Sequence, residues 1–232
     1  MAQSFTDFRA LPVGDFVSSD FVNADGVASI VDNSYAQGNA LLSNGGDGGW
    51  SGIGLASVQH PLDAEVSVVC ADNGIGSNWR MLSLFMADPE NGFATGDQYV
   101  LATRCFDSDI WFYVNDNLLG YLGNIPALAD GDVYTLRSTA TIGGILAEVL
   151  VNGIVILSSE VLLADLPRTT GYAGYTNRSG RPNDSAATYS FGLGTDGDSA
   201  PTSPVATGPD TPINPSVTNL LATSARLNWE QG

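Results

Sequence analysis

Residues 133–158 read VYTLRSTATIGGILAEVLVNGIVILS, and this stretch contains the strongest structural signals in the chain. The run Val151–Ile154 places Asn-Gly between two β-branched residues, which predicts a two-residue type I′ hairpin because both turn positions need positive φ. Gly143-Gly144 predicts a second tight hairpin between runs of strand-forming residues. The stretch therefore predicts three consecutive antiparallel strands at 133–141, 145–151 and 154–158.

Outside this stretch, alternating apolar and polar residues with turn residues at short intervals predict further strands. These strands are expected at 64–71, 80–87, 98–106, 109–114, 118–122 and 187–193, with a third hairpin turn at 115–117. The aromatic-rich first 35 residues suggest an edge segment that leads into a strand. Only 161–166 suggests a short helical turn. The pattern predicts an all-β fold, a two-sheet jelly-roll sandwich, over residues 1–195.

The segment 80–87 differs from the other predicted strands because it carries apolar residues on both faces. Leu82, Leu84 and Met86 alternate with Met81 and Phe85. A strand of this kind is buried on both sides. We therefore expect a loop or another subunit to cover its outer side.

The chain is strongly acidic. Its formal net charge is -17, and its eight basic residues are all Arg. Such a charge repels phosphate backbones and anionic lipids, so neither nucleic acid nor membrane insertion is expected. No apolar stretch approaches the roughly 20 residues of a membrane span, and no secretory signal is visible at the N-terminus. Cys70 and Cys105 are predicted to be free thiols, because a β-meander would hold them two strand spacings apart.

The composition changes after Gly194. Residues 196–215 are rich in Pro, Gly, Ser, Thr and Asp, which predicts an extended linker because such a segment cannot bury a core. A domain boundary is expected at this point. Residues 216–232 then form a separate C-terminal segment.

The order of motifs along the chain indicates which kind of jelly roll to expect. The runs Asp109–Asn115, Ala129–Arg137, Glu148–Leu157 and Thr170–Tyr175 follow an aromatic-rich N-terminal edge. This order resembles the concanavalin A-like and laminin G-like jelly rolls. The tail 215–229, PSVTNLLATSARLNW, resembles the first strands of a fibronectin type III domain, with Trp229 where that family buries a tryptophan.

A jelly roll followed by fibronectin type III strands resembles tailed-bacteriophage virion proteins such as tail fibres, adhesins and head decorations. The resemblance implies a non-enzymatic protein on the exterior surface of the virion. It would contact other virion proteins, form a homo-oligomer or assembly component, and bind host cell-surface polysaccharide. The alternative is a carbohydrate-binding or adhesion module of a bacterial extracellular protein. A glycoside hydrolase or lyase of the same fold is the third hypothesis.

The sequence contains no recognisable pattern of catalytic residues. Retaining glycosidases need two carboxylates about 5 Å apart, and none of the five glutamates lies within five residues of another. His60, the single histidine, precedes Pro61 in a predicted turn and has no partner in the sequence. We therefore expect no enzymatic activity and no catalytic residues.

Calcium is the one ion that the sequence permits, because oxygen ligands on loops suit Ca²⁺. The candidate ligands are aspartates in turn-like segments: Asp88, Asp107, Asp109, Asp130 and Asp132. The alternative is that these aspartates form turns.

Sugar-binding jelly rolls combine an aromatic platform with a few polar groups that fix the hydroxyls. The candidate glycan-binding residues are Trp50, Trp79, Arg80, Tyr175, Arg178 and Arg181. Core packing is the alternative role for each aromatic residue. Trp111 and Tyr113 also share one face of the strand 109–114, opposite Ile110, Phe112 and Val114, so one of these faces is a candidate exposed surface.

Overall fold

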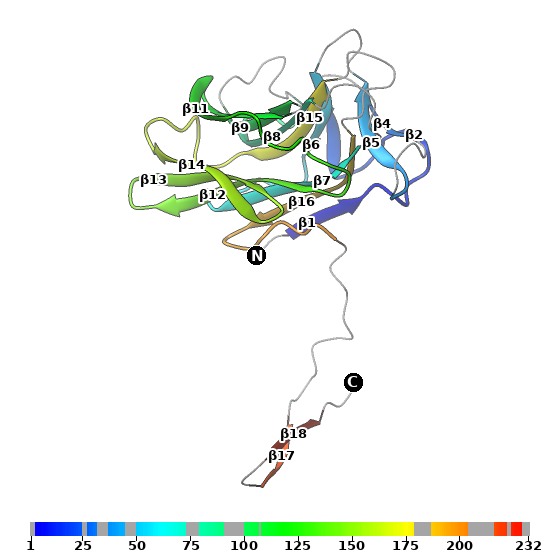
Figure 1. Ribbon diagram of the computed structural model, residues 1–232, viewed down its shortest axis with the longest axis vertical. Coiled ribbons are helices and arrows are strands. Elements are labelled where there is room, and N and C mark those ends of the chain that lie inside the picture. The colour runs from blue at the N-terminus through cyan, green and yellow to red at the C-terminus, as the bar shows by residue number, and fades with distance from the viewer. Residues whose placement is uncertain are drawn as a thin grey trace.

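A computed structural model shows an all-β sandwich of two antiparallel sheets (Figure 1). It describes residues 3–24, 27–31, 37–44, 50–72, 79–90, 100–106, 108–178, 187–203, 216–221 and 224–228. The predicted jelly-roll fold is confirmed. No helix in these ranges could cross a membrane.

The two sheets form the two layers of the sandwich. In spatial order, the first sheet contains β14 (Ile154–Leu162), β13 (Gly144–Val151), β12 (Val133–Thr141), β7 (Ala64–Ala71), β16 (Ala187–Thr195), β5 (Ala40–Asn44), β4 (Val27–Val31) and β2 (Gly14–Asp15), while β1 (Gln3–Asp7) also pairs with β16. The second sheet contains β11 (Asn117–Leu122), β10 (Asp109–Val114), β9 (Leu101–Phe106), β8 (Trp79–Met86), β15 (Tyr172–Arg178), β6 (Trp50–Leu55) and β3 (Phe21–Ala24). We call them the nine-stranded and seven-stranded sheets.

The two hairpins predicted within residues 133–158 form largely as predicted. Asn152 and Gly153 have φ of 51° and 76°, as a type I′ turn requires, and join β13 to β14. The preceding turn uses Ile142 and Gly143, since Gly144 already pairs in β13, so the predicted Gly-Gly turn is shifted by one residue. The helical turn predicted at 161–166 is wrong at its start, because β14 continues through Leu162.

The C-terminal strands β17 (Ser216–Leu221) and β18 (Ser224–Asn228) pair with each other as an antiparallel hairpin. Trp229 lies outside the described residues. The fibronectin type III resemblance and the domain boundaries stay predictions. Of the predicted linker, residues 196–203 are described, and the backbone N–H of Ala200 donates to Glu65 Oε1 on the nine-stranded sheet at 3.1 Å.

The aromatic N-terminal segment belongs to the core rather than to the surface. The rings of Phe8, Phe16, Phe21 and Phe191 form a chain of edge-to-face contacts, with successive centroids 5.4, 5.8 and 5.3 Å apart. Edge-to-face packing suits the ring quadrupoles, and burying these rings supplies much of the apolar area of the core. The segment thereby ties the start of the chain to β16.

A β-bulge at Phe85 changes the side-chain alternation expected for β8. Phe85 has φ of 63°, and the pairing of β15 with β8 shifts register between Tyr172 and Gly174. Phe85 therefore turns into the main core beside Leu84, whereas Met86 joins Met81 on the outer side. The predicted faces of Phe85 and Met86 are thus wrong, because the bulge interrupts the alternation on which the prediction was based.

The outer side of β8 is covered, as its apolar residues predicted. Met81 and Met86 are buried with Val100 and Ala102 in a cluster of their own. The segment after β8 also crosses the sheet, since the carbonyl oxygen of Pro89 lies 2.1 Å from the position of a Cβ on Gly54. A glycine is needed there because any side chain would collide with this backbone.

Cys70 and Cys105 are buried, and neither forms a disulfide bond. The predicted meander is wrong, however, because β7 and β9 belong to opposite sheets. Both cysteines lie in the core between the sheets. Burial raises the pKa of the Cys70 thiol to about 11, so the thiol stays protonated at neutral pH.

Candidate functional site

Five aromatic residues and one arginine share the outer face of the seven-stranded sheet. They come from four neighbouring strands, β8 to β11, and each is at least partly exposed. We call this set the aromatic surface: Trp79, Arg104, Phe106, Trp111, Tyr113 and Tyr121.

Strand alternation and register bring these residues together. On β10, Ile110 and Phe112 are buried in the core, so Trp111 and Tyr113 face outward, as the alternation predicted. Trp111 lies opposite Arg104 on β9 and opposite Tyr121 on β11. A row of large side chains therefore crosses three strands.

The rings contact one another along this face. Trp79 stacks on Phe106 with the ring centroids 4.0 Å apart, and Trp79 and Trp111 are nearly parallel, with centroids 6.1 Å apart. The rings of Trp111 and Tyr121 are tilted at 45°, with centroids 5.5 Å apart. Such contacts restrict the rotamers of the rings, so the surface is largely preorganised.

Arg104 lies at the centre of the aromatic surface. Its guanidinium carbon is 5.1 Å from the ring centroid of Trp79, 4.8 Å from that of Trp111 and 5.4 Å from that of Tyr113. Its Nη2 donates a hydrogen bond to the Tyr113 hydroxyl at 3.0 Å. These contacts attract the cation to the negative ring faces and hold it in place.

Tyr121 forms the most open end of the surface, with 52% of its area exposed. Its hydroxyl oxygen and Asp109 Oδ1 lie 2.4 and 3.0 Å from the position that a Cβ on Gly123 would occupy. Desolvation and the neighbouring Asp109 carboxylate raise the pKa of Tyr121. The phenol therefore stays neutral at physiological pH, and this end offers one hydroxyl and one carboxylate.

Three of the predicted glycan-binding residues align across neighbouring strands. Trp79 belongs to the aromatic surface. The backbone register places Trp79 opposite Arg178 on β15, and Arg178 opposite Trp50 on β6. Arg181 lies outside the described residues.

The predicted binding roles of Arg80 and Tyr175 are wrong. Both side chains are fully buried. Arg80 follows the outward-facing Trp79 directly, so strand alternation turns it toward the inside of the sandwich, and Tyr175 belongs to the main hydrophobic core. The Arg80 guanidinium donates to the carbonyls of Ala71 and Ala187, at 2.7 and 3.4 Å, and so joins the two sheets.

Arg104, Phe106 and Tyr121 are the members of the aromatic surface that the sequence did not single out. Their strands were predicted, and Arg104 and Phe106 are two residues apart in β9, which is the spacing for a shared face. The sequence did not show which strands lie side by side in the sheet. Only the pairing of β9 with β8 and β10 brings these side chains beside Trp79 and Trp111.

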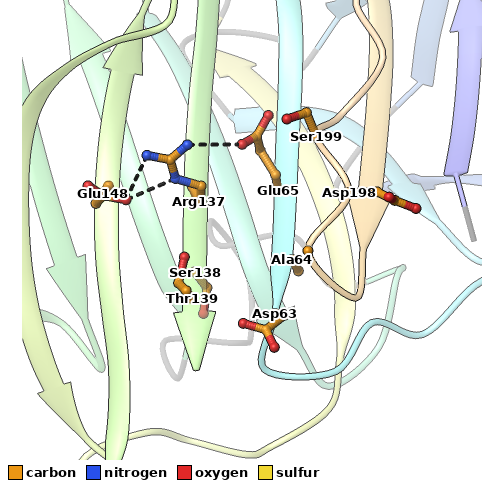
Figure 2. A pocket seen from close by; sticks show the side chains of 10 residues that line it. Asp63, Ala64, Glu65, Arg137, Ser138, Thr139, Glu148, Asp198 and Ser199 are labelled. Carbon is orange, nitrogen blue, oxygen red and sulfur yellow. Dashed lines mark hydrogen bonds and ion pairs between the residues drawn. The ribbon is translucent and has the colours of Figure 1, made fainter. Parts of the chain in front are cut away.

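The nine-stranded sheet has a shallow polar cavity of about 250 Å³ on its outer face (Figure 2). Glu65, Arg137 and Glu148 lie side by side on β7, β12 and β13, in register. Figure 2 shows Arg137 between the two carboxylates. It contacts Glu148 at 2.8 Å and Glu65 at 3.6 Å.

These two glutamates are far apart in sequence yet neighbours in the sheet, so their sequence spacing did not reveal the pair. Both carboxylates contact the same guanidinium, whereas a catalytic pair needs its two carboxylates to face the glycosidic bond. Burial raises the pKa of Glu65, while the Ala200 N–H and Arg137 oppose the shift. The arrangement joins strands and the 196–203 segment rather than forming a catalytic carboxylate pair.

Two of the calcium candidates, Asp130 and Asp132, accept hydrogen bonds that stabilise the turn before β12. Asp130 accepts from Tyr189 and from the backbone N–H of Asp72, whereas Asp132 accepts from Asn152 and from the N–H of Ala129. Within the described ranges, no group of three or more His, Cys, Asp or Glu side chains could hold a metal ion. Asp107 lies outside these ranges, and calcium binding stays a prediction.

No protein-family model matches the chain, and no curated protein does. Among solved structures, a Bacillus subtilis protein of unknown function with a galectin-like fold is 13% identical, with a TM-score of 0.54, covering 82% of this chain and 97% of that one. A Lotus tetragonolobus seed lectin is 12% identical, with a TM-score of 0.53 and coverages of 83% and 97%. The lectin UEA-II, complexed with galactose, is 12% identical, with a TM-score of 0.52 and the same coverages. At these identities the likeness shows the fold alone, a lectin-like jelly-roll sandwich.

Proposed function

We propose that this domain is a non-enzymatic carbohydrate-binding module and that the aromatic surface contacts the sugar. The observation that carries the proposal is the preorganised group of Trp79, Trp111 and Tyr121 around Arg104 on an outer sheet face. Lectins that share the fold support it, and one of them is described as a complex with galactose.

The chemistry of the surface suits a sugar. The C–H-bearing faces of a pyranose ring pack against aromatic rings, because burying both apolar faces releases water. The polar groups around the rings can then fix the hydroxyls: the N–H groups of Arg104 donate, whereas the Asp109 carboxylate accepts. Since the rings already contact each other, little side-chain entropy is lost on binding.

The direct test is a glycan array that displays neutral and acidic oligosaccharides, with galactose-terminated glycans among them. Trp111→Ala should weaken binding about 10-fold or more, because it removes a central stacking ring. Ile142→Ala is the matched control, since Ile142 is a fully exposed hairpin residue on the other sheet. A silent array, or equal binding by the wild type and Trp111→Ala, would overturn the proposal.

The proposal excludes glycoside hydrolysis as the main activity, because Glu65 and Glu148 are both engaged by Arg137. Incubation with any glycan that the array identifies should release no reducing ends. Sustained release that disappears in Glu148→Gln would contradict the non-enzymatic assignment.

A carbohydrate-binding role fits an extracellular or surface-exposed location, which we propose for this domain. Assignment to a virion stays a prediction, because neither the fold nor the aromatic surface is specific to virus particles. Detection of the chain in purified virions by mass spectrometry would support it. Homo-oligomer formation is likewise a prediction.

A further inference from the structure

Arg104 differs from the other described arginine side chains in its interaction partners. Arg9 pairs with Asp7, and Arg137 pairs with two glutamates. Arg80 and Arg168 donate to backbone carbonyls. Within the described residues, the Arg104 side chain has no carboxylate or carbonyl partner; its hydrogen bond is to the Tyr113 hydroxyl and its cation–π contacts are to three aromatic rings.

The unused donors of Arg104 are of two kinds. Its Nε is buried without a hydrogen-bond partner, whereas the hydrogen bond to Tyr113 uses Nη2 and leaves Nη1 as a second unused donor among the described residues. Cation–π contacts attract the charge to the rings but do not accept hydrogen bonds from the N–H groups. A planar, two-oxygen anion matches these in-plane donors better than a single hydroxyl does.

We infer that the aromatic surface selects a carboxylated sugar, with the sugar carboxylate on Arg104 and the sugar ring against Trp111 or Trp79. The inference rests on the proposed function and names the ligand class of that site. In a chain of net charge -17, an arginine that has no acidic partner among the described residues forms a local positive site at the centre of the rings.

The charges also orient the ligand. Asp109 lies at the Tyr121 end of the surface and repels a second anionic group. The carboxylate therefore points toward Arg104, and neutral hydroxyls point toward Asp109 and Tyr121. A sugar with one carboxylate per residue and a free hydroxyl edge meets both conditions.

The first experiment uses the wild-type chain and pairs of ligands that differ only in charge. The array carries uronic-acid and sialic-acid oligosaccharides, each beside its methyl ester, together with neutral galactose and glucose oligosaccharides. Esterification keeps the ring and the linkages but removes the negative charge. The acids should bind about 10- to 100-fold more tightly than their esters, because a charge-assisted pair is replaced by a neutral contact.

The second experiment compares variants of the full chain by calorimetric titration with trigalacturonic acid and its methyl ester, or with the best acid and ester pair on the array. Arg104→Gln should lose the preference for the acid, whereas Arg104→Lys should keep part of it, because the charge remains without the planar fork. Arg9→Met is the matched control, since it removes an arginine that is outside the aromatic surface. The thermal midpoint of each variant shows that it is folded.

The outcomes distinguish failure of the inference from failure of the proposed function. Binding of neutral sugars or esters as tightly as acids overturns the inference and leaves the proposed function standing. The same holds if the acid preference survives in Arg104→Gln. If the wild type binds no glycan at all, both the proposed function and the inference fail.

Discussion

Acidification from pH 7.5 to pH 5 should lower the free energy of unfolding of this domain by about 2 kcal/mol through the buried His60 alone. The backbone N–H of Phe85 donates to His60 Nε2 at 3.0 Å, and Nδ1 lies 2.8 Å from the carbonyl oxygen of Pro61. A carbonyl can only accept, so the neutral ring carries its proton on Nδ1. A second proton on Nε2 would face the Phe85 N–H and disrupt the bulge.

The sign follows from the two states of the ring. Burial lowers the pKa of His60 from 6.5 to about 4, against the opposing effect of the Pro61 and Tyr172 backbones. The unfolded chain therefore takes up a proton at a higher pH than the folded chain does. The stabilising effect is fully present above pH 6.5 and is lost as the pH falls toward 4, at up to about 1.4 kcal/mol per pH unit.

In the window above pH 5, His60 is the main group whose titration lowers the free energy of unfolding. His60 is the single histidine, and Glu65, whose pKa is raised mainly by burial, acts in the opposite direction in this range. The assay is urea unfolding followed by tryptophan fluorescence at pH 7.5, 6.5, 5.5 and 5. The loss of about 2 kcal/mol corresponds to a fall of roughly 4–8 °C in the thermal midpoint.

His60→Gln is the control, because glutamine has a donor and an acceptor but does not titrate in this range. Its absolute stability is lower, so the comparison is between slopes. We expect the variant to be nearly flat between pH 7.5 and pH 5. Parallel curves for wild type and variant would refute the reasoning, since the pH dependence would then come from other groups.

Three further predictions concern stability. Gly153→Ala should cost about 1 kcal/mol in urea unfolding, because its φ of 76° disfavours a side chain although nothing lies within 4 Å of the new Cβ, whereas the same change at an exposed strand position should be nearly neutral. Arg80→Met should lower the free energy of unfolding by about 2–4 kcal/mol and leave glycan affinity in the folded protein unchanged; weaker binding by a folded variant would restore its rejected role in the site. Arg137→Met should cost about 1 kcal/mol, because the guanidinium is one-third exposed, and a cost that persists in 1 M NaCl would contradict this ionic explanation.

Much of the fold was predictable from local patterns. The Asn152-Gly153 turn was visible because few residue pairs tolerate two successive positive φ values, and the faces of β10 were visible because side chains alternate strictly along a strand. The bulge at Phe85 was not predictable, since His60 Nε2 and Arg168 hold its backbone from segments distant in sequence.

The candidate site was predicted only in part, because strand alternation applies to neighbours along the chain and not across it. Trp79 was among the predicted glycan-binding residues, and the shared face of Trp111 and Tyr113 was predicted from alternation. Arg80 was misassigned because a charged residue is expected at the surface, yet its guanidinium can be buried when backbone carbonyls accept its hydrogen bonds.

The amino-acid sequence by itself determined that this chain forms short antiparallel strands with tight turns and carries a large negative charge. Those properties depend on residues close together in the chain. Only the tertiary structure decided that Trp79, Arg104 and Trp111 meet on one surface, and that Arg137 lies between Glu65 and Glu148. The physical reason is that lateral pairing and register in a sheet arise from the packing of the whole sandwich.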